Sequence, residues 1–239
     1  MANLVYEDCR GCLAQPFCKM FNGVIPKKEK RHCGPKYFLY ESLKSANIPL
    51  KFYNANTFHY NPLFPELDAA MCKIIDNIVS VIEEERKGFI FHSPTVGCGK
   101  TFCGCMLLNH YLYKVCQSDE FDIGKPLALY VDYADFIDTV RYEKKDVGEL
   151  FSWMKSVKLL MLDDVGAGKM SDFAREQTNI LINHRYNNQL STIVTSNLSP
   201  QELSRETLLG KRATSRLSDN AYVVAFSNNS FRDGGKFLC

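Results

Sequence analysis

The most constraining segment of this 239-residue chain is a glycine-rich turn at positions 94–101. It reads Pro-Thr-Val-Gly-Cys-Gly-Lys-Thr and follows a short apolar run, Gly88 to Phe91. An apolar helical pattern, Phe102 to Tyr113, comes directly after it. Glycines let successive backbone N–H groups turn inward around phosphate oxygens, lysine adds a positive charge, and a threonine hydroxyl is a ligand for Mg²⁺. A strand, such a turn and a helix in this order therefore predict a phosphate-binding loop.

Eight consecutive residues are the candidates for contact with a nucleotide at this loop. They are Thr95, Val96, Gly97, Cys98, Gly99, Lys100, Thr101 and Phe102. The chain departs from the G-x-x-x-x-G-K-[ST] pattern at its first position, where Pro94 replaces glycine. The two glycines nearest the lysine are present, so we expect the proline to tune the loop and not to disable it.

The chain is long enough for one sizeable α/β core with a small appendage. The chain is 46% apolar and 23% charged, as globular proteins are. No apolar stretch approaches the length of a membrane span, and the first eight residues lack the features of a secretory signal. We therefore expect a cytoplasmic protein without a membrane partner, in which the ten cysteines stay reduced.

Four cysteines gather near the N-terminus with the spacing C-x2-C-x5-C-x14-C, namely Cys9, Cys12, Cys18 and Cys33. A C-x2-C pair lets two thiolates reach one tetrahedral ion, and two further cysteines complete a structural zinc site. Metal would then supply the folding energy of a segment that has no core of its own. An iron–sulfur cluster fits the same ligands, and unligated cysteines in a tail are the remaining alternative.

Strand and helix patterns alternate after residue 66, which predicts a parallel sheet with helices on both faces. The expected strands are 88–91, 127–131, 157–162, 191–195 and 221–226, and the expected helices are 67–86, 102–113, 133–142, 147–155, 171–188, 200–204 and 209–217.

Two carboxylates, Asp163 and Asp164, follow the strand at 157–162. Ligands of open parallel sheets bind at the carboxyl ends of the strands, so these acids are expected beside the phosphate loop. We expect Asp163 to hold Mg²⁺ together with Thr101, and Asp164 to orient or deprotonate the attacking water. The alternative is a helix cap after the strand, a position that aspartate favours.

Further polar residues complete a candidate nucleotide site. Asn197 follows the next strand and can hydrogen-bond a γ-phosphate or a water, although alone it is typical of a turn. Arg212 and Arg216 are four apart on one helix and share a face. Arginine suits the charge that develops on a transferring phosphoryl group, and a neighbouring subunit can supply it. Arg232, near the C-terminus, is a third candidate.

The stretches LLMLDDVGAGK, RYNNQLSTIVTSNLSPQEL and LGKRATSRLSD, in this order after the phosphate loop, resemble the DnaC/DnaI-type helicase loaders of the AAA+ class. Relatives of that family include the transposition helper IstB. The resemblance covers residues 65–235 and is most specific at 191–218. It implies an AAA+ P-loop fold, ATP bound and hydrolysed between adjacent subunits, and loading of a hexameric replicative helicase onto single-stranded DNA, in a bacterial cell or a phage-infected host.

The resemblance also implies a role for each motif residue. Lys100 and Thr101 match Walker A, Asp163 and Asp164 match Walker B, Asn197 matches sensor 1, Arg216 matches the arginine finger acting in trans, Arg212 is its neighbour, and Arg232 resembles a late arginine near the nucleotide. Many AAA+ proteins have glutamate at the position of Asp164, so a slow hydrolysis step is expected.

The expected organisation has three parts. A cysteine-rich module at 1–48 binds metal and a partner, a linker covers 49–66, and the AAA+ domain covers 67–239. The alternatives are an IstB-like transposition helper, a small-molecule kinase using the same loop, and an adaptor in which ATP only stabilises assembly.

Overall fold

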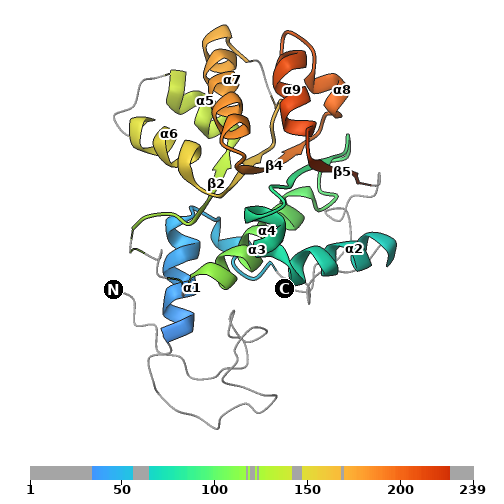
Figure 1. Ribbon diagram of the computed structural model, residues 1–239. Coiled ribbons are helices and arrows are strands. Elements are labelled where there is room, and N and C mark those ends of the chain that lie inside the picture. The colour runs from blue at the N-terminus through green and yellow to red at the C-terminus, as the bar shows by residue number, and fades with distance from the viewer. Residues whose placement is uncertain are drawn as a thin grey trace.

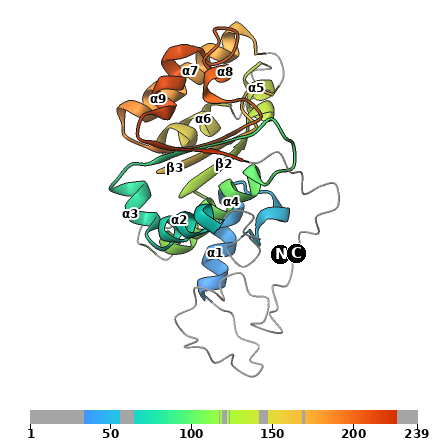
Figure 2. The same cartoon turned by 90° about the vertical axis from the view of Figure 1, so that its right-hand side faces the viewer.

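A parallel five-stranded sheet lies between two layers of helices (Figures 1 and 2). The computed structural model describes residues 34–55, 65–116, 118, 122, 124–141, 147–167 and 170–226. The strands are β1 (Gly88–His92), β2 (Ala128–Asp132), β3 (Leu159–Asp163), β4 (Ser191–Ser196) and β5 (Ala221–Ala225). Their order is β2-β3-β4-β1-β5, and every neighbouring pair is parallel. The predicted α/β fold with a parallel central sheet is confirmed.

Helices cover both faces of this sheet. On one face lie α1 (Gly34–Ser45), the 3-10 turn η2 (Leu50–Phe52), α2 (Pro65–Asp76), α3 (Ile78–Glu83) and α4 (Lys100–Val115). On the other lie α5 (Tyr133–Arg141), α6 (Val147–Ser156), α7 (Asp172–Asn187), α8 (Pro200–Leu203) and α9 (Gly210–Ser218).

The strands are apolar on both sides because both sides are covered. All five residues of β3 are buried. Successive side chains of a strand point to opposite faces, so Phe89 and Phe91 pack with α1 to α4 while Ile90 between them packs with α5 to α9. This two-sided burial explains the continuous apolar runs in the sequence.

The prediction of one helix over residues 67–86 is wrong in one respect, because the segment forms two helices. They separate at Asn77, whose φ of −110° and ψ of 23° lie outside helical geometry. The Asn77 side-chain amide donates to the Lys73 carbonyl at 3.1 Å. Asparagine side chains compete with helical backbone bonds in this way, which accounts for the break.

The segment from α1 to Ala55 belongs to the main core. Leu39 and Leu43 of α1 are buried among residues of α3 and α4. The backbone carbonyl of Ala46 accepts from the Tyr130 N–H of β2 at 2.8 Å, so the end of α1 occupies part of that strand's free edge. Asn109 of α4 donates to the Ala55 carbonyl at 2.9 Å. Residues that the sequence assigns to an N-terminal module and a linker therefore pack against the α/β core.

The four N-terminal cysteines of the predicted zinc module lie outside the described residues. Within the described residues, no group of three or more His, Cys, Asp or Glu side chains has the geometry of a metal site. No helix in this part of the chain is both long enough and apolar enough to cross a membrane.

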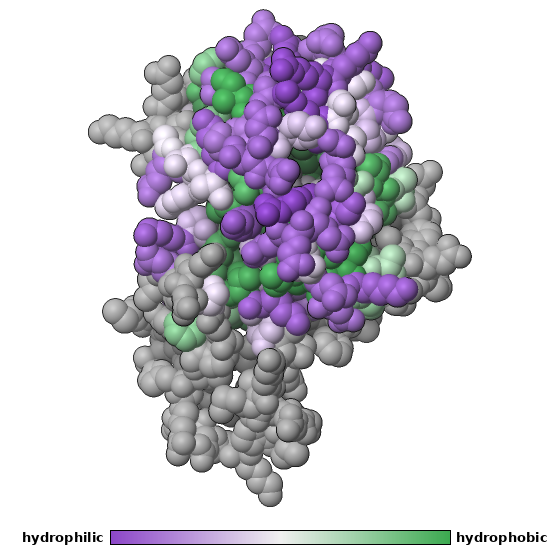
Figure 3. Space-filling view, in the orientation of Figure 1, coloured by the Kyte–Doolittle hydropathy of each residue, from purple (hydrophilic) through white to green (hydrophobic). Residues whose placement is uncertain are grey.

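The exterior of α7 to α9 is mostly hydrophilic, as Figure 3 shows for the face seen in Figure 1. Single apolar side chains interrupt it. Phe173 of α7 is 50% exposed and Ile180 of the same helix is 39% exposed. Isolated apolar side chains of this kind are normal on a protein surface.

A buried histidine in α4 makes the fold sensitive to acid. Burial lowers the pKa of His110 from 6.5 to about 4. The positive charge of Lys114 lowers it further, and the negative charge of Asp76 partly opposes both effects. Between these two values the unfolded chain binds more protons than the folded one, so stability falls as the pH falls through this window. We expect His110 to lower the free energy of unfolding by about 2 kcal/mol between pH 7 and pH 5, as measured by urea denaturation.

The variant His110→Gln has no titrating group at this position and should lose that part of the pH dependence. An identical pH dependence in the variant and the natural chain would contradict the assignment.

Candidate functional site

The strand order brings three loops of the candidate site together. The phosphate loop follows β1, the two aspartates end or follow β3, and Asn197 follows β4. Because β4 lies between β3 and β1 and all three strands run parallel, their carboxyl ends meet at one edge of the sheet. The chain leaves β1 for the distant strand β2, and such a reversal of strand order is where open α/β sheets bind ligands.

Two glycines of the phosphate loop have backbone conformations that other residues rarely adopt. Gly97 has φ of 82° and Gly99 has φ of 96°. Gly99 directly precedes α4 and offers no side-chain cap, so the N–H groups of the first helical turn keep their donor capacity. The helix N-terminus and the turn together form a cradle of N–H groups suited to an anion.

Lys100, the first residue of α4, is buried and turned back across the loop. Its ammonium donates to the Thr95 carbonyl at 2.9 Å and the Ser93 carbonyl at 3.3 Å, and it lies 3.5 Å from the Cys98 sulfur. The positive charge is thus held at the centre of the turn by neutral acceptors. A phosphate oxygen is a stronger, charged acceptor for the same ammonium.

His92 ends β1 directly before the loop. Burial lowers its pKa, Lys100 adds to this effect and the Glu202 carboxylate opposes it. The imidazole is therefore neutral at physiological pH, and the lysine supplies the positive charge nearest the turn.

The Asp163 carboxylate accepts hydrogen bonds from three hydroxyl groups. Thr101 of α4 donates to Oδ1 at 2.9 Å, and Thr195 of β4 donates to the same oxygen. Tyr130 of β2 donates to Oδ2 at 2.8 Å. Burial first, and the carboxylate second, raises the pKa of the Tyr130 phenol, so this hydroxyl keeps its proton. The structure thus brings Thr101 and Asp163, the two predicted Mg²⁺ ligands, into direct contact.

Asp164 and Asn197, two residues with predicted roles near the γ-phosphate, also contact each other. The Asn197 side-chain amide donates to Asp164 Oδ1 at 2.8 Å. Asp164 has φ of 58°, a left-handed conformation that aspartate tolerates better than most residues. Its backbone N–H donates to the Thr195 hydroxyl at 2.9 Å. One threonine therefore orients both aspartates, as donor to the first and acceptor from the second.

Sequence reasoning missed three residues of this site: Ser93, Tyr130 and Thr195. Thr195 directly precedes Ser196 and Asn197, so its place near the end of β4 was a usable signal. The sequence gives no signal for Tyr130, which reaches Asp163 only because β2 pairs with β3.

Arg216, the predicted arginine finger, does not join the residues around Lys100. Arg216 lines a cavity with Gly88, where β1 begins, and Asn220, directly before β5. It therefore lies near the amino edge of the sheet, opposite the phosphate loop. Arg212 is exposed on α9, and Arg232 lies outside the described residues.

The other loop candidates differ in exposure. Val96 is 55% exposed and Cys98 is buried. Phe102, in the first turn of α4, is partly buried against the hydrophobic core, which indicates a packing role for its ring.

Comparisons with known proteins agree with this geometry. No protein-family model matches the chain. The replicative helicase loader DnaI of Bacillus subtilis (strain 168) is 29% identical over 216 residues, which cover 86% of this chain and 66% of that protein. The crystal structure of the DnaC helicase loader is 26% identical, with a TM-score of 0.60, and the match covers 75% of this chain and 100% of that one. The chain is similar to the DnaC/DnaI-type helicase loaders in sequence and in fold.

This relationship confirms the resemblance seen in the sequence motifs. The chain spans just under two thirds of the length of DnaI, the curated relative that it matches. Two more distant structures share the fold. A crystal structure of DnaI has a TM-score of 0.60 at 21% identity, and AMPPCP-bound DnaA from Aquifex aeolicus has a TM-score of 0.56 at 18% identity.

The role of Thr195 can be measured without reference to nucleotide. Thr195→Val removes the donor to Asp163 and the acceptor for the Asp164 N–H while keeping a similar shape. We expect a loss of about 1–3 kcal/mol in the free energy of unfolding, because buried polar groups lose their partners. Urea denaturation measures this change.

Thr195→Ser, which keeps the hydroxyl, is the matched control and should lose clearly less stability. Unchanged stability in the valine variant, or a larger loss in the serine variant, would show that the methyl group, not the hydroxyl, is what matters at this position.

Proposed function

We propose that the chain is an ATP-dependent loader of a hexameric replicative helicase onto single-stranded DNA. The observation that carries the proposal is the contact between Thr101 and Asp163 at 2.9 Å. It joins the phosphate loop to the β3 carboxylate at the edge where Asn197 meets Asp164, in a relative of DnaI and DnaC. Phosphoryl transfer from ATP requires such a cradle, metal ligands and a water-orienting group close together.

The residues around Lys100 fit ATP and Mg²⁺ by their chemistry. The left-handed glycines and the first turn of α4 supply N–H donors, and the lysine ammonium is directed into the turn. The hydroxyl of Thr101 and the carboxylate of Asp163 are hard oxygen ligands of the kind that Mg²⁺ prefers. Bound ATP supplies the phosphoryl group, and the metal neutralises charge on its oxygens.

The chain's own groups then have distinct tasks. Lys100 exchanges its carbonyl partners for phosphate oxygens. Asp164 orients or deprotonates the attacking water, and Asn197, which already donates to that carboxylate, fixes its direction. Aspartate is shorter than glutamate, so we expect the water to be held less closely and the hydrolysis step to be slow.

Arg216 is proposed to act on ATP that is bound by a neighbouring subunit. Its side chain lies toward the amino edge of the sheet, while the chain's own phosphate loop follows the carboxyl end of β1. A five-residue strand separates these edges by about 16 Å, at roughly 3.3 Å per residue. This separation supports a homo-oligomer with ATP between subunits, to which Arg212 and Arg232 would contribute further positive charge.

The proposal that a helicase and DNA are the partners is supported by the described roles of the similar proteins. DnaI and DnaC are both described as helicase loaders. An IstB-like transposition helper is the alternative proposal, and it differs in requiring duplex DNA and a transposase.

We also propose that Cys9, Cys12, Cys18 and Cys33 hold zinc in a partner-binding segment that precedes α1 in the sequence. The support is their spacing, which matches structural zinc ligands. Metal analysis of the purified protein separates zinc from iron with sulfide.

The function is tested by mixing the protein with the replicative helicase of its source and ATP, then measuring the mass of the complex and the transfer of helicase to single-stranded DNA. We expect an ATP-dependent complex with the natural chain. Lys100→Ala should bind ATP at least tenfold more weakly, because a charged hydrogen bond to phosphate is lost, and should not form the ATP-dependent complex.

Lys158→Ala removes an exposed lysine just before β3 and is the matched control, with binding expected to be unchanged. Normal ATP affinity in Lys100→Ala would overturn the nucleotide site. Tight binding of duplex DNA without a helicase complex would favour the transposition helper.

A further inference from the structure

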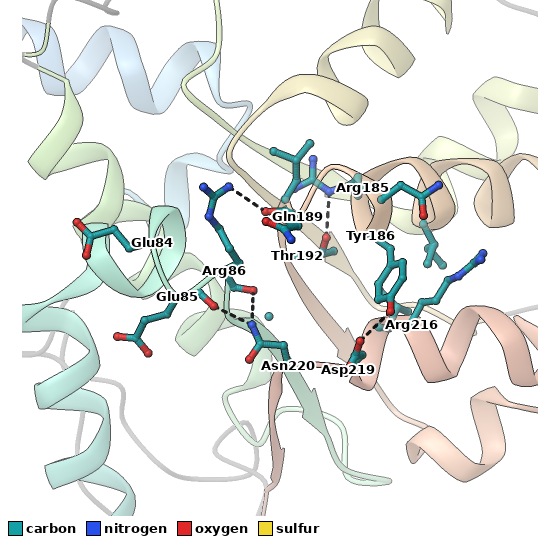
Figure 4. Close-up of a pocket in the computed structure, with 15 residues that line it drawn as sticks. Glu84, Glu85, Arg86, Arg185, Tyr186, Gln189, Thr192, Arg216, Asp219 and Asn220 are labelled. Carbon is teal, nitrogen blue, oxygen red and sulfur yellow. Dashed lines mark hydrogen bonds between the residues drawn. The ribbon is translucent and has the colours of Figure 1, made fainter.

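Arg216 lines a polar cavity of about 620 Å³ at the amino edge of the sheet (Figure 4). The walls come from the ends of α3, α7 and α9 and from the residues where β1, β4 and β5 begin. Tyr186 and Asp219 lie beside the arginine in this cavity.

The guanidinium of Arg216 stacks on an aromatic ring. Its central carbon lies 5.5 Å from the centroid of the Tyr186 ring, within the range of cation–π attraction. The Tyr186 hydroxyl donates to Asp219 Oδ2 at 2.9 Å (Figure 4). This hydrogen bond, followed by the charge of the carboxylate, raises the pKa of the phenol, so the hydroxyl stays a donor.

One nitrogen of the arginine makes no hydrogen bond within the part of the chain that the structure describes. Arg216 Nη1 is buried and has no hydrogen-bond partner among the described residues. The nearby Asp219 carboxylate instead accepts from Tyr186. The arginine is thus held by the face of a ring, which attracts the cation without occupying its N–H groups.

The backbone that carries Tyr186 is itself fixed. The preceding residue, Arg185, is fully buried, and its guanidinium donates to the carbonyls of Met154 at 2.7 Å and Val157 at 3.0 Å. These bonds join the last turn of α7 to the last turn of α6 and to Val157, which lies between α6 and β3. Asp219 directly follows α9, the helix of Arg216, so the three side chains are held by two packed helices.

We propose that Tyr186 and Asp219 are positioning residues for Arg216, directing its guanidinium toward a phosphate oxygen of ATP bound by the adjacent subunit. The ring limits where the guanidinium can lie, and the hydrogen bond to Asp219 limits where the ring can turn. The inference rests on the proposed action of Arg216 in trans and adds the two residues that orient it.

The test measures ATP hydrolysis by the ATP-bound assembly for a set of variants. Arg216→Ala should lower kcat by about a thousandfold or more. Tyr186→Ala should lower kcat about fivefold, the worth of one cation–π contact, with the KM for ATP unchanged. Tyr186→Phe and Asp219→Asn alter the hydrogen bond while keeping side-chain bulk, and each should lower kcat by a smaller and similar factor.

A double variant separates positioning from general stability. If Tyr186 acts only through the arginine, Tyr186→Ala should have no further effect in the Arg216→Ala background. Phe173→Ala, which removes an exposed aromatic ring from the other end of α7, is the matched control and should keep full activity. Unfolding midpoints identify any variant that is not folded. If Tyr186→Ala is not folded, the kcat values of Tyr186→Phe and Asp219→Asn test the positioning role instead.

Two failures can be distinguished. Unchanged hydrolysis in Arg216→Ala would overturn the proposed role of the arginine in trans. A large loss in Arg216→Ala with no loss in Tyr186→Ala, or a Tyr186→Ala loss that persists in the double variant, would overturn the positioning inference alone.

Discussion

The buried carboxylate of Asp163 is the point on which the candidate site depends. A carboxylate removed from water is costly unless hydrogen bonds compensate it, and here three hydroxyl groups do so. The donors come from α4, β2 and β4, so one charge joins three segments to the end of β3. Any shift of one segment must disturb the hydrogen bonds of the others.

This shared charge also relates the loop to the water-orienting residues. Thr195 donates to Asp163 and accepts from the backbone of Asp164, and Asp164 in turn accepts from Asn197. A metal bound at Thr101 and Asp163 would therefore influence Asp164 through one hydroxyl group, that of Thr195. Such a network is worth more than its separate bonds when every member is satisfied.

The second half of the proposed chemistry lies at the other edge of the sheet. The strands separate Lys100 from Arg216, so one chain presents its phosphate loop at one edge and its arginine at the other. Under the proposed function, neither edge completes a hydrolytic site alone. Hydrolysis would then depend on assembly, which suits a protein that acts on a multisubunit partner.

The sequence predicted the parts of the fold that depend on local pattern. Apolar runs located β3 and the other strands, and the glycines located the loop before Lys100. Pairing between distant strands has no local signal, so Tyr130, 33 residues before Asp163, was missed. The stacking of Tyr186 on Arg216 was missed for the same reason, because it depends on how α7 packs against α9.

The central claim, that each ATP site is shared by two subunits, is tested most directly by mixing two inactive variants. Lys100→Ala keeps the arginine and loses the loop's lysine, whereas Arg216→Ala keeps the loop and loses the arginine. Neither should hydrolyse ATP alone. Mixed in equal amounts, they should regain roughly a quarter of natural ATPase activity, because about one interface in four then pairs an intact loop with an intact arginine if subunits mix at random. A mixture that forms mixed assemblies but stays inactive would contradict the account.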